Sequence, residues 1–449
     1  MTAYRSDPFS TRGVQRRRYL CAVHHWFLPV ALFVLLGFVG CQQTNVPPVL
    51  PLALTPTALA PGDQSSSAQE ESSVITSQER QLVVWVPAFF QPQETPPVAV
   101  LQTVYDQFRH NHPSVHLDIQ VKAESGESSL YTYLRYAQSM APTILPDVVL
   151  LNTEQLWQAA ELGLIQPVDW NGLPRTNDFF QFARTAVTYH EQTLGIPYAA
   201  DVLHLVYHTN QIAQAPATWE ALMVVGAPYF FAAGKRDYPN ESLLLQYVGA
   251  GGQLFEDGTV SNPDALTALF AFLVQAKAAA VLPSDVLELK SFNDTWSLFT
   301  KKNVGFADVS AHVVLAQQDA AADLGFAQIP TVSGATITIA HTWAFALLTP
   351  LPEQQQLALE LINQLLEPTV HSAWSRATRQ LPTQISAYDS ALDASPYHEF
   401  LHRQLDVAIA IPNGPHFADF ARRLQQAQES VLLNQLTVED AVKFVQSAP

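Results

Sequence analysis

Cysteine is almost missing from this sequence. The 449 residues include only Cys21 and Cys41, both near the N-terminus. The rest of the chain can therefore form no internal disulfide and no metal cluster built on thiolates. Its folded state has to be stabilised by a hydrophobic core.

Basic residues are also scarce. Lysine and arginine together number 23, against 40 aspartates and glutamates. The first 40 residues hold five of the basic residues and one of the acidic ones, which leaves 18 basic and 39 acidic residues and a net charge near −21. So acidic a chain is repelled by nucleic acids and by anionic membrane surfaces. We therefore expect no nucleic-acid partner.

Common catalytic motifs are absent too. There is no G-x-S-x-G sequence, no cysteine placed for catalysis and no carboxylate pair framed by a motif. Gly249–Gly252 lacks the lysine and serine of a phosphate-binding loop, and His190-Glu191 lacks the second histidine of a zinc-protease helix. We predict no enzymatic activity and no cofactor. A surface glycoside hydrolase or lyase stays open as an alternative, because paired acids can be scattered along a chain.

Three histidines, His110, His112 and His116, lie within seven residues. No carboxylate or cysteine completes a ligand set with them at a fixed spacing. They fall where a predicted helix turns into a predicted strand. We therefore predict a solvated loop here, and no metal site.

The first 40 residues have the order of a signal peptide. Three consecutive arginines at 16–18 precede the apolar run Trp26–Gly40, which is too short for a comfortable membrane span. Small residues then lead to Cys41, as in bacterial lipoprotein signals, although Phe38 stands where leucine is usual. We predict a signal peptide over 1–40 and lipidation of Cys41. An uncleaved anchor, cleavage elsewhere and a twin-arginine signal are the alternatives.

Residues 41–80 are rich in proline, serine, threonine and glutamine and show no helical or strand period. Such a segment cannot bury enough apolar surface to fold, so we predict a disordered, lipidated tether. About 370 residues follow. That is more than one core usually serves, so we expect two lobes.

Strand and helix patterns alternate after the tether. Apolar or alternating runs predict strands at 82–86, 115–121 and 147–151. One-sided apolar spacing predicts helices through 98–108, 131–139 and 153–162. This alternation predicts a parallel sheet with a ligand crevice at the carboxyl ends of its strands.

The segment Gly195–Leu222 places an acid at the entrance of a buried strand. Asp201 precedes the apolar run 202–207, and Thr218 then caps a helix that begins at Trp219. A carboxylate there is costly unless it is paired or solvated by a ligand. This segment resembles the hinge crossover of extracellular solute-binding proteins of ABC transporters, the maltose-binding type (family 1). In that family the crossover presents an acidic residue to the ligand cleft.

The resemblance continues in order over roughly residues 81–445. It includes Tyr247–Phe255, Gly305–Asp308, a returning strand at 336–348 and a helix at 354–366. It implies an α/β, two-lobed periplasmic-binding-protein fold (type II) with a ligand cleft between lobes joined by hinge strands. The implied first lobe comprises residues 81–203 plus 345–368. The implied second lobe comprises 204–344 plus 369–449.

Sugar ligands need aromatic faces and planar polar side chains in a mostly apolar cleft. The resemblance implies such roles for Trp85, Phe89, Glu154, Gln155, Asp201, Asn240, Glu241, Asp308, His312 and Trp343. Purely structural roles are the alternatives for several of these residues. The tryptophans could be core residues, Asp201 could bond to backbone, and the acids could be solvated residues of a first helical turn.

The resemblance implies a substrate-binding lipoprotein of an ABC importer. By hinge closure it would capture a small solute, an oligosaccharide or other carbohydrate, and deliver it to membrane permease subunits. The expected location is outside the cytoplasm, lipid-anchored to the cell membrane, in the periplasm or at the cell surface. We expect a monomer. A receptor for a signalling partner, and a non-sugar solute such as a peptide, polyamine or metal-chelate, are the alternatives.

Overall fold

The structure is a computed structural model that describes residues 80–92, 95–170, 173–235, 239–255, 261–317, 323–391 and 395–447. The chain divides into two units, Met1–Val74 and Ile75–Pro449, and every described residue belongs to the second. The predicted signal peptide, the lipidation site Cys41 and the tether up to residue 79 lie outside the described residues.

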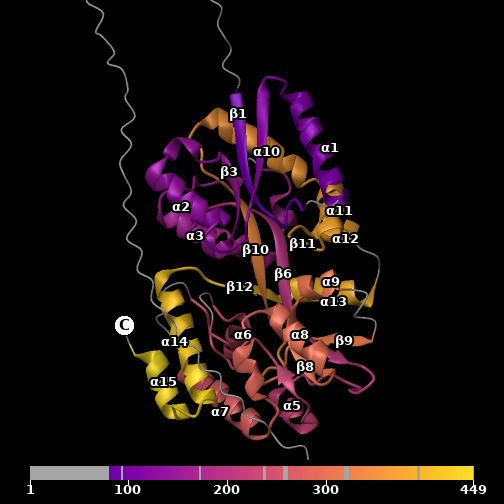
Figure 1. The fold of residues 1–449 in the computed structure, drawn as a ribbon, viewed down its shortest axis with the longest axis vertical. Helices are drawn as coiled ribbons and strands as arrows, with labels where there is room; N and C mark the ends of the chain where they lie inside the picture. The colour runs from indigo at the N-terminus through magenta and orange to yellow at the C-terminus, as the bar shows by residue number, and fades with distance from the viewer. Residues whose placement is uncertain are drawn as a thin grey trace, which may run out of the picture. The chain divides into compact units, whose positions relative to one another are not determined.

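Three parallel strands form the core sheet of the first part of the unit, which we call the first lobe (Figure 1). They are β1 (Arg80–Pro87), β2 (Val115–Lys122) and β3 (Val148–Asn152), and β1 lies between the other two. The helices between them are α1 (Thr95–Asn111), α2 (Leu130–Met140) and η1 (Pro142–Ile144), and α3 (Thr153–Glu161) follows β3. These elements confirm the predicted alternation of strands and helices.

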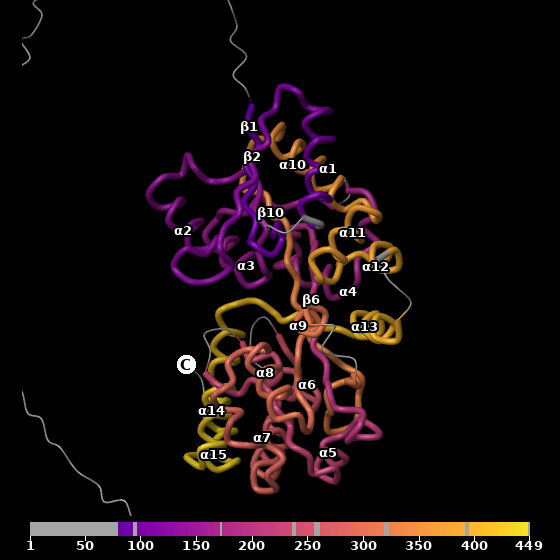
Figure 2. Tube along the Cα trace, turned by 45° about the vertical axis from the view of Figure 1, so that its right-hand side comes forward, coloured from indigo at the N-terminus to yellow at the C-terminus, as the bar shows by residue number. Residues whose placement is uncertain are grey.

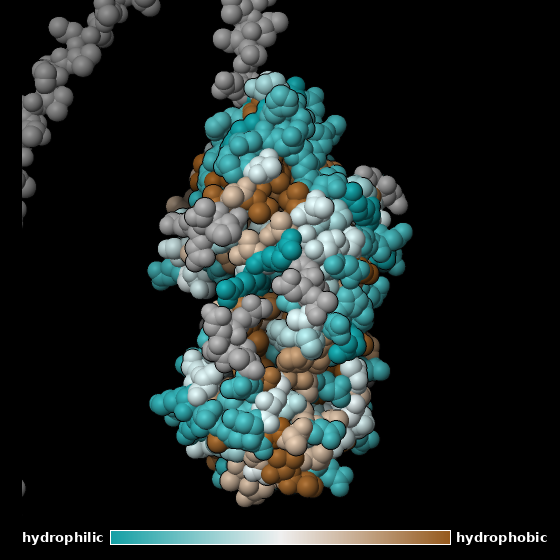
Figure 3. All heavy atoms as spheres, turned by 90° about the vertical axis from the view of Figure 1, so that its right-hand side faces the viewer, coloured by the Kyte–Doolittle hydropathy of each residue, from teal (hydrophilic) through white to brown (hydrophobic). Residues whose placement is uncertain are grey.

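The outer side of α1 is polar, because Gln102, Asp106 and Gln107 point away from the sheet. Figure 3 shows this hydrophilic surface at the top of one face. The inner side carries Leu101, Val104 and Phe108, all buried. Such one-sided burial is what the apolar spacing of this segment predicts.

Two long strands run from the first lobe into the rest of the unit. They are β6 (Ile196–His208) and β10 (Thr338–Leu347), which pair antiparallel from Ile196 against Phe345 to Val202 against Ala340. Figure 1 shows them passing side by side between the two lobes. Between β3 and β6 lie η3 (Thr176–Asp178), α4 (Gln181–Ala186) and the hairpin of β4 (Thr188–Tyr189) and β5 (Gln192–Thr193).

The second lobe is built around the far end of β6. There β8 (Phe306–Ser310) and β9 (Leu324–Ala327) pair antiparallel with β6, and β7 (Tyr229–Phe230) lies parallel to β8. Its helices are α5 (Trp219–Val225), α6 (Glu241–Gly249), α7 (Pro263–Ala278), η4 (Ser284–Glu288), α8 (Phe292–Lys302) and α9 (Ala311–Ala316). The cap of α5 is Thr218, as predicted, and its side chain accepts from the backbone N–H of Ala221.

The C-terminal elements return to both lobes (Figure 2). They are α10 (Pro352–Leu365), α11 (Pro368–Thr378), β11 (Leu381–Pro382), α12 (Ile385–Ala391), α13 (Pro396–Val407), β12 (Ala408–Ala410), α14 (Pro415–Leu432) and α15 (Val438–Gln446). No helix within the described ranges has both the length and the apolar character needed to cross a membrane.

The helix α11 packs with the first lobe, whereas the sequence boundaries assigned residues 369–449 to the second. Its Trp374 is fully buried in the first-lobe core and donates from Nε1 to the carbonyl of Phe90 at 2.9 Å. Glu367, just before α11, forms a bidentate ion pair with Arg175. The sequence could not reveal this, because a helix with one apolar face can pack on either lobe.

One apolar cluster joins the two lobes beside the crossing strands. We call it the hinge cluster. It combines Phe180 and Phe182 near α4, Val202 of β6, Ala311 of α9 and Leu401 of α13, with further neighbours. The imidazole of His204, also on β6, is fully buried there and lies 2.8 Å from the hydroxyl of Tyr397. Burial lowers the pKa of His204 to about 4, so it stays neutral.

Candidate ligand cleft

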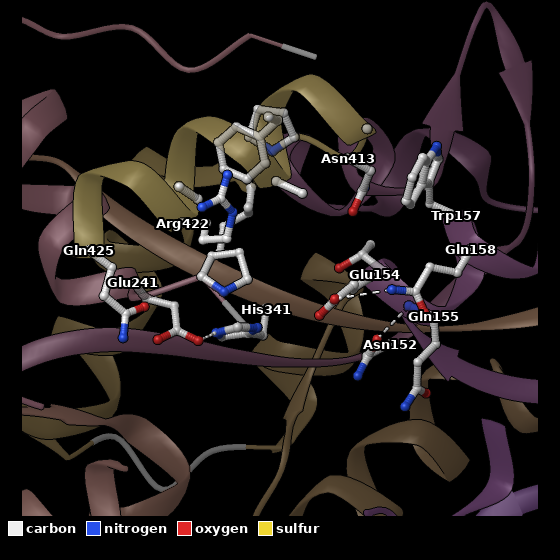
Figure 4. A pocket seen from close by; sticks show the side chains of 18 of the residues that line it. Asn152, Glu154, Gln155, Trp157, Gln158, Glu241, His341, Asn413, Arg422 and Gln425 are labelled. Atoms are coloured by element: carbon white, nitrogen blue, oxygen red, sulfur yellow. Dashed lines mark hydrogen bonds and ion pairs between the residues drawn. The ribbon is translucent and has the colours of Figure 1, made fainter. Parts of the chain in front are cut away.

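A cavity of about 930 Å³ lies between the two lobes. Its first-lobe wall is made by the loop that leads to α2 and by the start of α3, and its second-lobe wall by α6, α14 and the loop before α14. Figure 4 shows the side chains from these elements turned toward a common space. A volume of this size falls in the upper range of small-molecule sites.

Local sequence explains the first-lobe wall. Asn152 ends β3 and caps α3, because its side chain accepts from the backbone N–H of Gln155 at 2.8 Å. This cap directs the first turn of α3, with Glu154 and Gln155, into the cavity. Gln158 lies one turn later and donates to Glu154 at 3.2 Å. The fixed turn holds planar polar groups that suit a polar ligand.

A histidine on the crossing strand β10 forms the floor. His341 lines the cavity, and its Nε2 lies 3.0 Å from the Oε1 atom of Glu241, the first residue of α6. The Glu241 side chain is 3 % exposed, whereas that of His341 is 34 % exposed. The contact is an ion pair only when His341 is protonated, and its Glu241 side is the one shielded from solvent.

The carboxyl of Glu154, on the first lobe, interacts electrostatically with His341 and Glu241. Desolvation in the cleft raises the pKa of Glu154 above its ordinary value; His341 lowers it, and the charge of Glu241 raises it further. These groups therefore form one electrostatic unit contributed by α3, β10 and α6. A ligand that bonds to any of them changes the charge balance between the lobes.

The second-lobe wall adds cationic and apolar groups. Arg422 of α14 lines the cavity and is held by an ion pair with Asp419, one turn earlier. Lys235 and Phe417 line the same wall. Figure 4 shows Arg422 and Trp157 at opposite ends of the cavity. The cleft thus carries more charged side chains than the mostly apolar, aromatic cleft that the sequence predicted.

The structure places three of the predicted site residues in this cavity: Glu154, Gln155 and Glu241. Phe89 and Trp343 lie together elsewhere on the first lobe, with ring centroids 4.7 Å apart, and both pack against the first-lobe core. The backbone N–H of Phe89 donates to the cavity residue Glu124 at 3.1 Å. This hydrogen bond connects the Phe89 backbone to the cavity wall.

Three other predicted residues have structural roles. Asp308 is fully buried in the second lobe and accepts at 2.8 Å from the Tyr229 hydroxyl. Asn240 is 1 % exposed because its side chain caps α6 and donates to the carbonyl of Ala232. Trp85 is 4 % exposed in the first-lobe core. These residues are corrected from ligand contacts to core and capping residues, because their polar atoms or rings face protein.

Asp201 and His312 are also corrected from ligand contacts to structural residues, and they contact each other. Asp201 lies in the middle of β6, where the sequence predicted a strand entrance, and accepts from the backbone N–H groups of Val202 and His312. The His312 ring approaches the carbonyl of Arg379 and the side-chain amide of Gln380. Together they connect β6, the start of α9 and the segment after α11. The carboxylate of Asp201 is therefore satisfied by the protein itself.

The sequence reading missed His341, Trp157 and Arg422. Two of them carried a usable signal. His341 is two residues before the predicted Trp343 on one strand, so both side chains point to the same face, although Trp343 does not line the cavity. Trp157 is three residues after Glu154 on one helix, which places it on the same side. Arg422 carried none, since nothing in α14 shows which part of its surface meets the other lobe.

The histidine cluster near α1 is also explained. His112 follows α1 and its Nε2 lies 2.8 Å from Glu360 of α10. Within the described ranges, no group of three histidine, cysteine, aspartate or glutamate side chains is placed to hold a metal ion.

Comparisons with known proteins agree with this geometry. The family model described as bacterial extracellular solute-binding protein matches residues 105–397. The maltotriose-binding protein of Pyrococcus abyssi is 21 % identical over 264 residues, which covers 56 % of this chain and 54 % of that protein. The chain thus spans about half the length of this curated relative.

Solved structures show the same fold. Maltose-bound MalE3 of T. maritima superposes with a TM-score of 0.65 at 18 % identity, over 82 % of this chain and 98 % of that one. The cyclic α-maltosyl-1,6-maltose binding protein of Arthrobacter globiformis gives 0.66 at 19 % identity, over 82 % and 97 %. MalE of Listeria monocytogenes, in complex with maltose, gives 0.64 at 16 % identity, over 82 % and 98 %. The two-lobed α/β arrangement is therefore that of MalE-type binding proteins.

Proposed function

Because the chain belongs to the bacterial extracellular solute-binding protein family, a family of binding proteins and not of enzymes, we propose that it is the substrate-binding lipoprotein of an ABC importer. It captures an oligosaccharide or another carbohydrate between its lobes and hands it to the permease subunits in the membrane. The observation that carries this proposal is the cavity lined by both lobes, with the crossing strand β10 at its floor.

The geometry supports binding coupled to closure. A ligand that contacts α3 on one side and α6 or α14 on the other favours the conformation in which the lobes are close. The polar groups suited to sugar hydroxyls are Gln155, Gln158, Asn413 and Gln425. Tyr131, Trp157 and Phe417 provide the aromatic surface. The relatives named above, which are named for maltotriose or a cyclic maltosyl-maltose or are bound to maltose, support the carbohydrate class.

The charged side chains favour one alternative ligand class. Glu154, Glu241 and Arg422 would suit a small charged solute such as a peptide or polyamine. Both ligand classes can be tested in one experiment, because a bound ligand of either class raises the unfolding temperature of the protein.

We expect thermal unfolding of the full chain to shift upward with one class in a panel of mono- and oligosaccharides, amino acids, peptides and polyamines. Ligand at about one hundred times its dissociation constant adds about 2.7 kcal/mol to the free energy of unfolding. A shift with sugars alone supports the proposal, and a shift with peptides or polyamines alone replaces the carbohydrate. If no compound shifts a well-folded protein, the proposed ligand classes are wrong.

The site is tested by Glu154→Gln, with Glu161→Gln on the same helix as its matched control. Glu161 is exposed at the end of α3 and does not line the cavity. We expect the first variant to weaken binding roughly tenfold, as for loss of a charge-assisted hydrogen bond, and the second to leave it unchanged. Equal affinities for the two variants, measured by titration calorimetry, would remove Glu154 from the site.

A further inference from the structure

An aromatic path leads out of the cavity along the first lobe. Trp157 of α3 lines the cavity, and its ring lies edge to face with that of Tyr189, at 6.3 Å between centroids and 73° between planes. Tyr189 in turn lies 4.0 Å from the ring of His190. These ring contacts lead from Trp157 in the cavity wall to the hairpin of β4 and β5, whose Tyr189 also packs against the first-lobe core.

This hairpin is firmly held in place. Its strands pair Thr188 with Thr193 and Tyr189 with Gln192. The carbonyl of Thr193 accepts from the N–H of Val168 at 2.8 Å, so the hairpin is also tied to the segment after α3. A rigid support keeps the rings in one arrangement, so a ligand that contacts them does not have to order the loop.

The turn of the hairpin has an unusual backbone conformation. His190 and Glu191 both have left-handed backbone conformations, with φ of 45° and 64°. Glycine or asparagine fills such turn positions at little cost, whereas other side chains cost about 1–2 kcal/mol each. Both side chains are exposed. The chain thus has a histidine and a glutamate at two turn positions where the backbone conformation favours glycine or asparagine.

Polar groups along the path are left unsatisfied by the protein. The Nε1 atom of Trp157 is buried and has no acceptor among the described residues. The Tyr189 hydroxyl and the His190 ring likewise make no side-chain hydrogen bond within the described part of the chain. Aromatic rings that expose apolar faces and spare polar edges are suited to stack on a sugar and bond to its hydroxyls.

We propose that Tyr189 and His190 form an outer subsite that binds the sugar units of an oligosaccharide extending beyond the cavity past Trp157. This inference rests on the proposed carbohydrate function and adds to it a preference for longer chains. Short saccharides fill the cavity alone, whereas longer ones also stack on the hairpin.

The test compares affinity against chain length. Titration calorimetry of the full chain uses linear glucose oligomers of two to seven units in α-1,4, β-1,4 and β-1,3 linkage. In the linkage that binds, we expect affinity to rise roughly three- to tenfold once the chain exceeds the cavity, the gain typical of one aromatic contact. Tyr189→Ala should abolish that rise and leave the affinity for the shortest binding oligomer unchanged.

Two controls make the result specific. Tyr136→Ala removes another tyrosine of the first lobe, 60 % exposed on α2 and outside the cavity lining, and should keep the length dependence. His190→Ala removes only the outer ring and should lose part of the gain. It also guards against misfolding caused by loss of the Tyr189–Trp157 contact.

The possible failures are distinguishable. If affinity is independent of length in the wild type, or if Tyr189→Ala and Tyr136→Ala behave alike, the outer subsite is wrong while the carbohydrate function stands. If no oligomer binds in any linkage, the proposed function fails, and the subsite with it.

Discussion

Asp308 shows how much one buried side chain can matter to stability. It is fully buried, and desolvation raises its pKa to about 7, whereas its hydrogen bond from Tyr229 lowers it. The Tyr229 hydroxyl is also bonded by Gln246, which accepts from Trp219. A chain of polar groups thus runs through the second-lobe core, and the carboxyl at its end is neutral under mildly acidic conditions.

This burial predicts a specific dependence of stability on pH. The unfolded chain loses the Asp308 proton near pH 3.8, but the folded chain keeps it up to about pH 7. Between these values the folded chain binds more protons, so its stability falls as the pH rises. Relative to the wild type, Asp308→Asn should gain up to about 4 kcal/mol of unfolding free energy between pH 4 and pH 8.

Urea unfolding of both proteins at several pH values measures this difference. Asp285→Asn serves as the control, because Asp285 lies on the surface beside Lys302. Its stability should run parallel to that of the wild type across the range. A constant difference between Asp308→Asn and the wild type would show that Asp308 is ionised throughout.

The roles of single residues were the hardest feature to predict from the sequence. An acid in an apolar strand signals that something must satisfy its charge, and this held for Asp201. The sequence could not tell that the satisfying groups are backbone N–H groups from α9 and from Asp201's own strand, and not a ligand. Glu154 and Glu241 look no different in sequence, yet they point into the cavity because Asn152 and Asn240 cap their helices.

At the scale of elements, most of the fold was predictable. The apolar runs and spacings of β1, β2, β3, β10 and the helices between them are strong, since burial imposes a period on sequence. Tertiary pairing is different. That β10 lies between β3 and β6, and that α11 joins the first lobe, depends on contacts between segments far apart in the chain.

The junction of α8 with β8 gives an element-scale prediction. Gly305 has φ of 84°, and a Cβ atom there would lie 2.0 Å from the carbonyl oxygen of Pro228. That oxygen accepts from the N–H of Phe306, one of the bonds that align β8. We expect Gly305→Ala to lower the unfolding free energy by at least twice the cost of backbone strain alone, which is about 1–2 kcal/mol.

Gly163→Ala isolates that strain. Gly163 also has positive φ, at 70°, but no atom of the described residues lies within 4 Å of an added Cβ atom. The two variants are compared by their urea midpoints at equal slope. Similar losses would mean that the loop before β8 moves aside at little cost.

For the whole molecule, we propose anchoring through lipid on Cys41 after removal of residues 1–40. Cys41→Ser should then move the protein from the membrane fraction to the soluble extracellular or periplasmic fraction, because the lipid attaches to the thiol. A variant with Cys21→Ser, inside the proposed signal, should remain at the membrane. Membrane retention of both variants would favour an uncleaved N-terminal anchor.

The return of the chain to the first lobe has a consequence for biosynthesis. The first-lobe core contains Phe345 of β10 and Trp374 of α11, and the hinge cluster needs Leu401 and Leu405 of α13. Neither can be completed until most of the polypeptide has left the ribosome, since N-terminal segments usually fold first only when they form whole domains. We therefore expect both apolar clusters to stay incomplete for most of the synthesis. A protein destined for the outside of the cell benefits from this delay, because an export channel that threads extended polypeptide can accept it before it folds.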